Sequence, residues 1–419
     1  MKRTGNLIKN TVMLYILQFS SYFFSFITVP YQTRVLGPEV YGVVGFATAV
    51  MVYFQLFLDF GFMLSATEDI SKHREDKAYI EKKLTSITVL KCFLTGISAI
   101  VMAALCLFVP KFRADPTLYL LYFAAYAANA FLPDFLYRGI EKMTAITVRT
   151  VAIRAFFAVM IFVFLRTKEQ VLMIPLLLLI GNIGAVAGAF LHILRALGYR
   201  FRRVCRADVL ADLRRSLFFF VSRIATTVYS AANTVILGFV DTTGTATGCY
   251  ASADKVLTTA KSGMSPIADS LYPYMVKHRD FKLVKKLLLF AMPVIAAGCA
   301  VVFIFAKPLC VLAFGEEFAG AAPILRAFVP AVAAILPSYV LGFPTLGAMG
   351  RSADANRSVL VGTVVHIVGL GILFAVGKPE AVYFAAMTSV SEWAILICRI
   401  VMVAKHKGLL KSPEEEESE

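Results

Sequence analysis

The segment PYQTRVLGPEVYG, residues 30–42, holds one arginine, a glycine–proline pair and one glutamate where two long apolar stretches meet. These stretches cover residues 10–36 and 40–68, and each exceeds the about 20 residues that a helix needs to cross a bilayer. Because glycine followed by proline marks a turn, we expect Gly37 and Pro38 to form a tight turn between two membrane helices. Arg34 then lies at the outer end of the first helix.

The composition of the chain is that of an integral membrane protein. Hydrophobic residues make up 59% of its 419 residues and the mean hydropathy is +0.74, whereas soluble domains are about 45–50% apolar. The alternating pattern of a membrane β-barrel is absent. The seven cysteines are scattered without a CxxC pair, so neither a disulfide framework nor a metal site is expected. The sequence predicts no cofactor.

Twelve apolar segments are long enough to span a bilayer, so we predict an all-α integral membrane protein with about 12 transmembrane helices. The N-terminus begins like a signal peptide, but the apolar run after it is too long for one and is the first membrane helix. The predicted spans are residues 10–36, 40–68, 84–109, 117–138, 144–165, 171–194, 216–240, 245–275, 284–306, 321–348, 355–376 and 380–403.

Lysine and arginine are concentrated in alternate connections between these spans, on the side that carries the N-terminus. Such connections stay in the cytoplasm, so both termini are predicted to be cytoplasmic. The net charge of +15 is therefore mainly a signal of topology. It also suits contact with anionic headgroups of the lipid bilayer, and no nucleic acid partner is needed to explain it.

The most basic connection, residues 197–215, divides the chain into an N-terminal lobe, residues 1–196, and a C-terminal lobe, residues 216–404. A charged cytoplasmic tail follows at residues 405–419. The lobes align at an offset of 206 residues, which places YGVVGFATAV (41–50) over TGCYASADKV (247–256). Six helices in each lobe give parallel repeats, which in transporters enclose a path between the halves. The alternative is chance similarity between apolar segments.

Small residues and prolines mark particular helices. Pro323, Pro330, Pro337 and Pro344 are seven residues apart and share one helix face. Because proline removes an intrahelical hydrogen bond, this helix either bends as a gate or carries a static kink. Two glycine pairs spaced by four, Gly184 with Gly188 and Gly244 with Gly248, predict close helix packing.

Charged residues inside membrane spans are costly and usually face a cavity or a partner. Arg154 and Lys255 lie near the middle of their spans, whereas Arg223 and Lys261 lie toward the cytoplasm. Lys91 is near a helix end and is expected to extend toward the interface. The acidic residues within spans are Asp59, Glu68, Asp134, Asp254, Asp269 and Glu392.

These charges have two interpretations. In one, they form structural ion pairs, with Asp254 bound to a cation elsewhere. In the other, the cations line a hydrated cavity for an anionic substrate, and Arg154 with Lys255 bind the anion. The carboxylates that then balance charge or couple transport to protons are Asp59, Asp254, Asp269 and Glu392. A lone histidine such as His366 is more often only hydrogen-bonded.

The segments PYQTRVLGPEVYGVVGF (30–46) and LDFGFMLSATEDIS (58–71) resemble the polysaccharide repeat-unit flippases. These are the Wzx-type oligosaccharide translocases of the multidrug/oligosaccharidyl-lipid/polysaccharide (MOP) superfamily, which includes the MATE multidrug and toxin extruders. Over residues 1–110 the motifs carry the resemblance, and over the rest helix count and loop layout carry it. The flippase of the peptidoglycan precursor typically has fourteen helices, which argues against that relative.

The resemblance implies a V-shaped bundle of two six-helix lobes. It implies a substrate of undecaprenyl diphosphate carrying an oligosaccharide, which alternating access moves from the cytoplasmic to the outer leaflet of the bacterial cytoplasmic membrane. It also implies coupling to protons, sodium or the membrane potential, and partners in polysaccharide polymerisation or export. Family members use cavity arginines and lysines, and the residues matched to that role here are Arg34, Arg154, Arg223, Lys255 and Lys261.

Only Arg34 of these five lies inside a recognisable motif. Residues 30–42 then form a hinge at the outer rim, where Arg34 either meets the diphosphate or latches the outward gate. The gate candidates in the C-terminal lobe are Pro330, Pro337 and Pro344.

Several rival functions are weighed against the flippase. No nucleotide-binding P-loop, metalloprotease or nucleophile-elbow motif is present, so we expect neither an ATPase nor another enzyme. An ion-coupled multidrug or toxin antiporter of the same superfamily is the nearest rival, although a cation-rich cavity argues against cationic drugs. A glycan polymerase or ligase is expected to carry a large outer loop, which is absent. A non-transporting scaffold would tolerate loss of every intramembrane charge.

Overall fold

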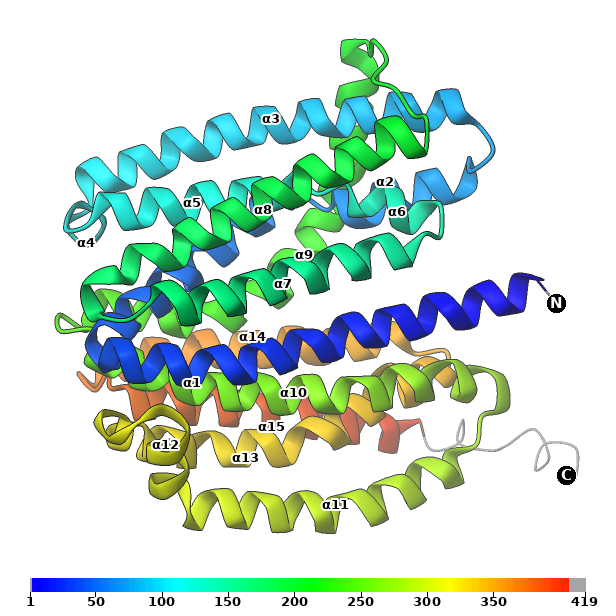
Figure 1. The fold of residues 1–419 in the computed structure, drawn as a ribbon. Coiled ribbons are helices and arrows are strands. Elements are labelled where there is room, and N and C mark those ends of the chain that lie inside the picture. Colours follow the sequence, from blue (N-terminus) through cyan, green and yellow to red (C-terminus); the bar gives the residue numbers. More distant parts are fainter. Residues whose placement is uncertain (1, 407–419) are drawn as a thin grey trace, which may run out of the picture. The chain divides into compact units, whose positions relative to one another are not determined.

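The structure is a computed structural model of the chain. It describes residues 2–406, without the side chains of residues 2–11, 14, 21, 222 and 225–230. Residues 2–406 form helices and contain no strand (Figure 1). Of the predicted tail, residues 405–419, only residues 405 and 406 lie within the described part.

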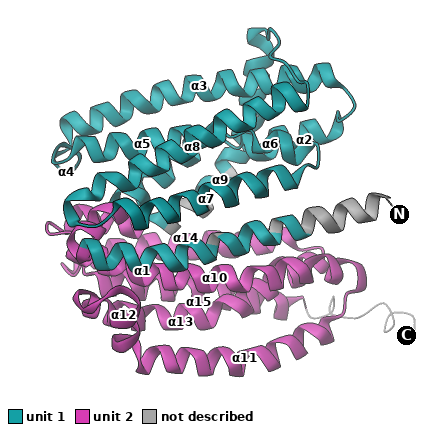
Figure 2. Ribbon diagram, in the orientation of Figure 1, with its two compact units in different colours: residues 1–36, 46–231 teal, residues 37–45, 232–419 magenta. Residues whose placement is uncertain are grey.

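The chain divides into two compact units, and each is described by itself (Figure 2). The N-terminal unit comprises residues 1–36 and 46–231, and the C-terminal unit comprises residues 37–45 and 232–419. The division falls within a single long helix, whereas the sequence placed it in a basic connection. The predicted lobe boundaries stay a prediction.

The N-terminal unit is built on helices that pack in the pairs α5 with α8, α7 with α8, α2 with α6 and α3 with α5. A π-helical turn, η2, extends α8. The elements of the N-terminal unit are most of α1 (Lys2–Asp59), then α2 (Phe62–Lys72), α3 (Lys77–Phe108), α4 (Pro110–Arg113), α5 (Pro116–Ala130), α6 (Asp134–Gly139), α7 (Met143–Phe164), η1 (Lys168–Leu172), α8 (Met173–Leu191), η2 (His192–Ala196) and the larger part of α9 (Arg206–Val240).

The C-terminal unit is centred on α13, which packs against α10, α11 and α15, while α14 packs against α15. A π-helical stretch, η4, continues α13 and includes Gly342, whose backbone leaves the helical region at φ −66° and ψ −122°. After the end of α9, its elements are α10 (Thr245–His278), α11 (Phe281–Ile304), α12 (Ala306–Phe314), η3 (Glu316–Gly320), α13 (Ala321–Val340), η4 (Leu341–Gly347), α14 (Ser352–Ala375) and α15 (Ala381–Lys405).

Among the described residues, 8 helical stretches are long and apolar enough to cross a membrane. The first of them is interrupted at Gly37, where φ 68° and ψ 171° lie in a region that only glycine adopts readily. The predicted break at residue 37 is therefore present as a kink between two helical segments. The chain is a multi-pass, all-helical membrane protein, as predicted, and the number of twelve spans stays a prediction.

The helical segment after Gly37 packs against α10 almost backbone to backbone. A Cβ atom added to Gly42 would lie 1.9 Å from the carbonyl oxygen of Gly244, and one added to Gly248 would lie 1.9 Å from that of Pro38. Both pairs of positions are related by the offset of 206 residues, so the contact is reciprocal. This reciprocity supports the internal repeat against chance similarity.

The predicted packing of the two glycine pairs has different outcomes. Gly244 and Gly248 are confirmed as a close contact. The prediction for Gly184 and Gly188 is wrong, because a Cβ atom added at either meets no described atom within 4 Å. Both residues are exposed on α8, so no neighbouring helix approaches them within the described part of the chain.

The turn before α10 is fixed by one carboxylate, that of Asp241. It accepts hydrogen bonds from the backbone N–H groups of Thr243 (3.1 Å), Gly244 (3.0 Å) and Thr247 (2.8 Å). It also accepts from the hydroxyls of Thr243 and Thr247, each at 3.0 Å. Partial burial alone would raise the pKa of Asp241, but these hydrogen bonds outweigh it and hold that pKa below its usual value.

Candidate functional site

The N-terminal unit contains an electrically charged cavity, here called cavity B, with a volume of about 510 Å³. Its walls come from α1, α5, α6, α7 and α8. The charged residues that line it are Arg138, Arg149, Arg154 and Asp134. Three arginines against one aspartate give the cavity a formal charge of plus two, so it suits an anion. Gln18, Asn129 and Asn182 add neutral polar groups to the same wall.

Arg154, one of the predicted residues, reaches cavity B from the middle of α7. Its side chain is half-buried, and Nη1 donates a long hydrogen bond of 3.4 Å to the carbonyl of Leu17. No carboxylate pairs with it among the described residues. The predicted role of Arg154 in a cationic cavity is therefore compatible with its position.

Arg149 and Arg138 carry buried donor atoms that lack a described partner. Arg149 donates from Nη2 to Oδ1 of Asp134 at 2.6 Å. Its Nε and Nη1, and Nε of Arg138, are buried and have no hydrogen-bond partner among the described residues. Unsatisfied buried donors are costly, more so when charged, and such groups in native proteins are normally met by a ligand or ordered water.

A second cavity, cavity C, has a volume of about 330 Å³ and shares Tyr126, Asn129, Leu132 and Asp134 with cavity B. Two cations and two carboxylates line it, so its formal charge is zero. The predicted residues Arg223 and Asp59 form an ion pair here.

Lys91 also lines cavity C, and the expectation that it extends toward the interface is wrong. Only 4% of the residue is exposed. Its ammonium group donates to the backbone carbonyls of Ala130 and, at 3.4 Å, Leu132. The end of α5 leaves these carbonyls without helical partners, and Lys91 satisfies them.

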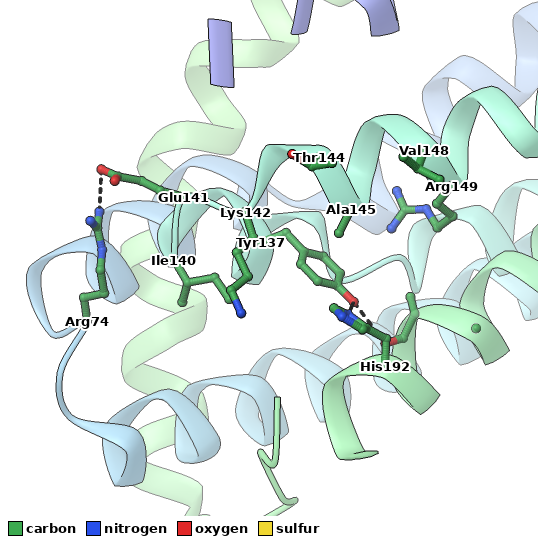
Figure 3. A pocket seen from close by; sticks show the side chains of 12 residues that line it. Arg74, Tyr137, Ile140, Glu141, Lys142, Thr144, Ala145, Val148, Arg149 and His192 are labelled. Carbon is green, nitrogen blue, oxygen red and sulfur yellow. Dashed lines mark hydrogen bonds and ion pairs between the residues drawn. The ribbon is translucent and has the colours of Figure 1, made fainter. Parts of the chain in front are cut away.

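A third and larger cavity, cavity A, has a volume of about 950 Å³. The Tyr137 hydroxyl hydrogen-bonds to Nδ1 of His192 at 2.9 Å and donates to the carbonyl of Ala189 at 3.1 Å. Arg74 pairs with Glu141 at 2.9 Å at one end of the same cavity (Figure 3). Arg149 lines both cavity A and cavity B.

In the C-terminal unit, two cations inside membrane helices are bound to neighbouring side chains. Lys261 on α10 donates to Glu392 on α15 at 2.6 Å, and Glu392 is buried. Arg399 is also buried, and it donates to the hydroxyls of Ser358 at 2.9 Å and Ser338 at 3.0 Å, as well as to the Ser338 carbonyl. These contacts agree with the interpretation in which charges inside membrane helices form structural ion pairs and hydrogen bonds.

A neutral polar network lies beside these pairs. Asn233 hydrogen-bonds to Nε2 of His366 at 2.8 Å and donates to the hydroxyls of Tyr250 at 2.8 Å and Thr388 at 2.9 Å. The other ring nitrogen of His366 bonds to Ser391 at 3.0 Å. His366 is thus hydrogen-bonded on both sides, as expected of a lone histidine in a membrane helix.

The other predicted residues of the C-terminal unit do not gather at one point. Asp254 is half-buried on α10 without a hydrogen bond or ion pair among the described residues, and the adjacent Lys255 is exposed. Asp269 accepts from Ser265 at 3.1 Å and lines a cavity of about 570 Å³ together with Pro344 and Arg399.

The hinge candidates lie where the sequence placed them, within one helical run. Pro330 and Pro337 are inside α13, and Pro344 is inside η4, next to the distorted Gly342. Arg34 is exposed near the end of the first segment of α1. Their roles as a gate, and that of Arg34 at the rim, stay predictions.

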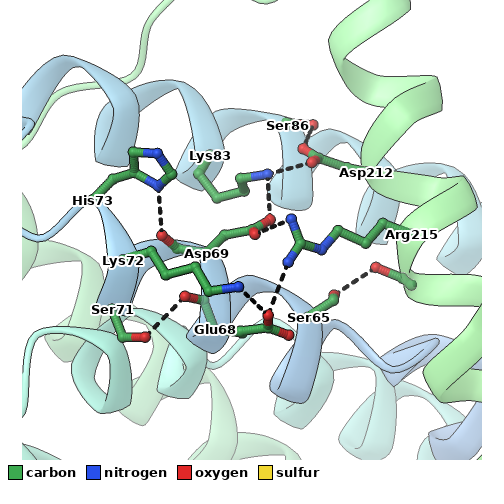
Figure 4. Close-up of polar contacts among 11 residues, drawn as sticks. Ser65, Glu68, Asp69, Ser71, Lys72, His73, Lys83, Ser86, Asp212 and Arg215 are labelled. Carbon is green, nitrogen blue, oxygen red and sulfur yellow. Dashed lines mark hydrogen bonds and ion pairs between the residues drawn. The ribbon is translucent and has the colours of Figure 1, made fainter.

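A cluster of charged groups that the sequence analysis missed joins α2, α3 and the start of α9 (Figure 4). Asp69 binds Lys83 at 2.9 Å and also pairs with Arg215, while Asp212 pairs with Lys83 and accepts from Ser86 at 2.6 Å. This cluster fixes the start of α9, which belongs to the predicted basic connection, onto the N-terminal unit.

Arg138 and Arg149 were also missed as site residues, because their positive charge was assigned to the cytoplasmic connections. One signal existed: residue 149 falls inside the predicted span 144–165. Among the described residues no group of three histidine, cysteine or acidic side chains is placed to hold a metal ion.

The chain is similar to known proteins along its length. A family model described as polysaccharide biosynthesis protein matches residues 7–279. A protein of Escherichia coli (strain K12) named "Putative O-antigen transporter" is 24% identical over 411 residues, which cover 97% of this chain and 98% of that protein. A protein of the same name from Shigella dysenteriae is 23% identical, covering 86% and 91%.

Solved structures share the fold. The lipid II flippase MurJ, in an inward closed conformation, superposes with a TM-score of 0.68 at 12% identity, covering 95% of this chain and 87% of MurJ. A variant of the MATE transporter VcmN of Vibrio cholerae gives a TM-score of 0.58 at 16% identity, covering 97% and 98%. The predicted MOP-type membrane fold is confirmed. With its family model matched over most of its length, the chain belongs to the polysaccharide biosynthesis protein family.

Proposed function

We propose that the chain is a flippase that moves a lipid-linked oligosaccharide repeat unit from the cytoplasmic to the outer leaflet by alternating access. The observation that carries the proposal is the similarity, along nearly the whole chain, to proteins named as O-antigen transporters. The fold shared with a lipid II flippase supports it. The carrier lipid is undecaprenyl diphosphate, and the membrane is the bacterial cytoplasmic membrane.

The chemistry of such a substrate matches cavity B. A diphosphate headgroup with attached sugars cannot cross about 30 Å of hydrocarbon unaided, because its charges and hydroxyls would lose their water. The arginines of cavity B replace water around the phosphate oxygens. The side-chain amides of Gln18, Asn129 and Asn182 offer both donors and acceptors to sugar hydroxyls.

The energy source in this proposal is a proton or sodium gradient or the membrane potential. The carboxylates predicted to couple transport to an ion differ in whether they already have a partner. Asp59 and Glu392 are held in ion pairs with Arg223 and Lys261, and Asp269 accepts a hydrogen bond from Ser265. Asp254 has neither kind of partner among the described residues. Asp254 is therefore the first coupling candidate. No catalytic step is proposed for the chain, and polysaccharide polymerase or export proteins are its proposed partners.

The test is the sidedness of the lipid-linked glycan in cells depleted of the protein, read with a sugar-specific probe that does not cross membranes. Depletion should trap the glycan on the cytoplasmic leaflet and stop its appearance outside. Normal sidedness with normal outer glycan would overturn the proposal. In that case, resistance to cationic drugs on overexpression would identify the antiporter alternative.

The same assay tests the residues predicted to bind the anion. Replacing Arg154 and Lys255 together by alanine should lower glycan export roughly ten- to hundredfold, since a hydrogen bond to a charged group contributes about 1.5–3 kcal/mol. Arg166→Gln, which changes an exposed arginine of α7's C-terminal connection outside all three cavities, is the matched control. Full export by the double alanine variant would remove both residues from the site.

A further inference from the structure

We propose that Arg138 and Arg149 bind the oxygens of a phosphate group in cavity B, and that Asp134 restrains Arg149 until the anion arrives. The inference deepens the proposed function, on which it rests only for the source of the phosphate. It adds two arginines and one carboxylate to the site, none of which was among the residues predicted to contact substrate.

Cavity B contains buried donor atoms that no described group satisfies. Nε and Nη1 of Arg149 and Nε of Arg138 are buried without a described partner. Water or an anion must satisfy them, and the formal charge of plus two in cavity B favours an anion with two negative charges. A terminal phosphate group carries about −1.5 to −2 near neutral pH, and the diphosphate of a sugar-linked lipid carries a similar total charge, with one negative charge on each phosphate.

Cavities A and C fit this role less well than cavity B. Cavity C has no net charge, its Arg223 is paired with Asp59, and its Lys91 is bound to backbone carbonyls. Cavity A also has a net positive charge, from Arg74, Lys142 and Arg149 against Glu141, but Arg74 is paired with Glu141 and Arg149 is shared with cavity B. The buried guanidinium donors without a described partner therefore belong to cavity B, whose volume of about 510 Å³ lies within the usual range for ligand sites.

The geometry of the Arg149 guanidinium makes Asp134 a competitor of a bound phosphate. A phosphate bound side-on or end-on uses Nη2 together with either Nε or Nη1. Asp134 already accepts from Nη2 of Arg149 at 2.6 Å, and the Asp134 side chain is 17% exposed. A bidentate phosphate must therefore share Nη2 with Asp134 or displace it. The carboxylate keeps Arg149 in place before an anion binds and weakens anion binding through like-charge repulsion.

Cavity A offers a route to this site. Arg149 lines both cavities, and Figure 3 shows its side chain beside the part of cavity A that Tyr137 and His192 line. Arg74 and Lys142, which line cavity A, belong to connections predicted to face the cytoplasm. An anion that reaches cavity A from the cytoplasm thus meets the guanidinium that also forms the wall of cavity B.

The experiment measures binding of ³²P-labelled inorganic pyrophosphate to the full-length protein in nanodiscs of phosphatidylcholine, a lipid without net charge. We expect saturable binding that Arg149→Gln and Arg138→Gln each weaken roughly ten- to hundredfold. Asp134→Asn should tighten binding several-fold, because it removes the competing charge. Arg166→Gln is the matched control and should bind like the unmodified protein.

The Asp134→Asn variant separates anion binding from a structural role. If Arg149 only held Asp134, removing either partner would disturb the fold in the same way and would not tighten binding. Weaker binding by Asp134→Asn, or equal pyrophosphate affinity of folded Arg149→Gln and unmodified protein, would overturn the inference. Folding of each variant is read from its size-exclusion profile and thermal unfolding.

A second arm identifies the source of the phosphate. Undecaprenyl diphosphate is added to the nanodiscs, and displacement of labelled pyrophosphate by the lipid assigns the site to a lipid headgroup. Arginine-dependent binding without displacement supports the anion site and assigns it to a free phosphate compound. Failure of the glycan sidedness test would overturn the proposed function while leaving pyrophosphate binding measurable, so the two failures are distinguishable.

Discussion

Two sites, cavity B in the N-terminal unit and the Lys261–Glu392 pair in the C-terminal unit, hold charge within membrane helices in different ways. Within the C-terminal unit, the segment after Gly37 and helix α10 are related by 206 residues and meet at reciprocal glycines. In the N-terminal unit, guanidinium atoms around cavity B have no described partner, although other cations of that unit are paired. In the C-terminal unit, Lys261 and Arg399 are bound to neighbouring side chains.

The difference shows that a charge inside a membrane helix is an incomplete signal of a binding site. An ion pair such as Lys261 with Glu392 already satisfies both members, so its first effect is on stability. A cation that borders a cavity without a carboxylate partner, such as Arg154, is available to a ligand. Substitutions should therefore affect stability at the Lys261–Glu392 pair and transport at Arg154.

Breaking the Lys261–Glu392 pair should have the largest effect on stability. Glu392→Ala leaves Lys261 without its carboxylate partner inside the membrane, and removing one member of a buried pair costs about 3–5 kcal/mol. Because the Lys261 side chain is 23% exposed, we expect a value near the lower end. Thermal unfolding of the purified protein in detergent measures the loss.

Two variants sharpen this result. Replacing the pair together, Lys261→Met with Glu392→Leu, should restore most of the lost stability, because no charge is then left unpaired. Arg154→Ala in the N-terminal unit should change the free energy of unfolding by about 1 kcal/mol or less. If Arg154→Ala destabilised the protein as much as Glu392→Ala, the contrast between the two sites would fail.

The sequence predicted the all-helical membrane fold, whereas the partners of the charges inside the helices could not be read from it, for physical reasons. Span length and apolar composition locate helices because each must cover the bilayer by itself. Whether a charged side chain meets a carboxylate depends on how the helices pack. Lys261 and Arg154 are therefore both single charges in an apolar span when read from the sequence, but only Lys261 has a carboxylate partner among the described residues. Arg149 and Arg399 were counted as cytoplasmic charge although both fall inside predicted spans.

The shared glycine contact should have the next largest effect. Gly248→Ala places a Cβ atom 1.9 Å from the Pro38 carbonyl oxygen, and the backbone can relieve this only by moving the helices apart. Overpacking of this kind costs about 1–3 kcal/mol. Gly42→Ala should cost a similar amount, because its contact with Gly244 is the equivalent one. Thermal unfolding of both variants in detergent measures the effect.

Gly184→Ala is the matched control, since its added Cβ meets no described atom within 4 Å. Alanine is also the better helix former by about 1 kcal/mol, so this variant should unfold at the same temperature or slightly higher. Equal destabilisation by Gly184→Ala and Gly248→Ala would show that helix propensity, and not the crossing, decides the cost.

The smallest expected effect concerns the turns that precede the two equivalent helices. The turn before α10 is held by Asp241, whereas the position 206 residues earlier is Val35, and the first turn depends on the positive φ of Gly37. Because hydrogen bonds hold the pKa of Asp241 below its unfolded value, its charge stabilises the fold above about pH 4. That contribution is lost as the pH falls through the pKa of the folded state.

Asp241→Asn removes the titrating group and should lower stability at neutral pH by about 1 kcal/mol, a typical value for a lost cap. The difference in unfolding temperature between the two proteins should shrink as the pH is lowered from 7 toward the folded-state pKa of Asp241. A difference that stayed constant would mean that the charge of Asp241 does not contribute. The turn before α10 and the turn at Gly37 would then differ in backbone shape and not in the contribution of a charged side chain.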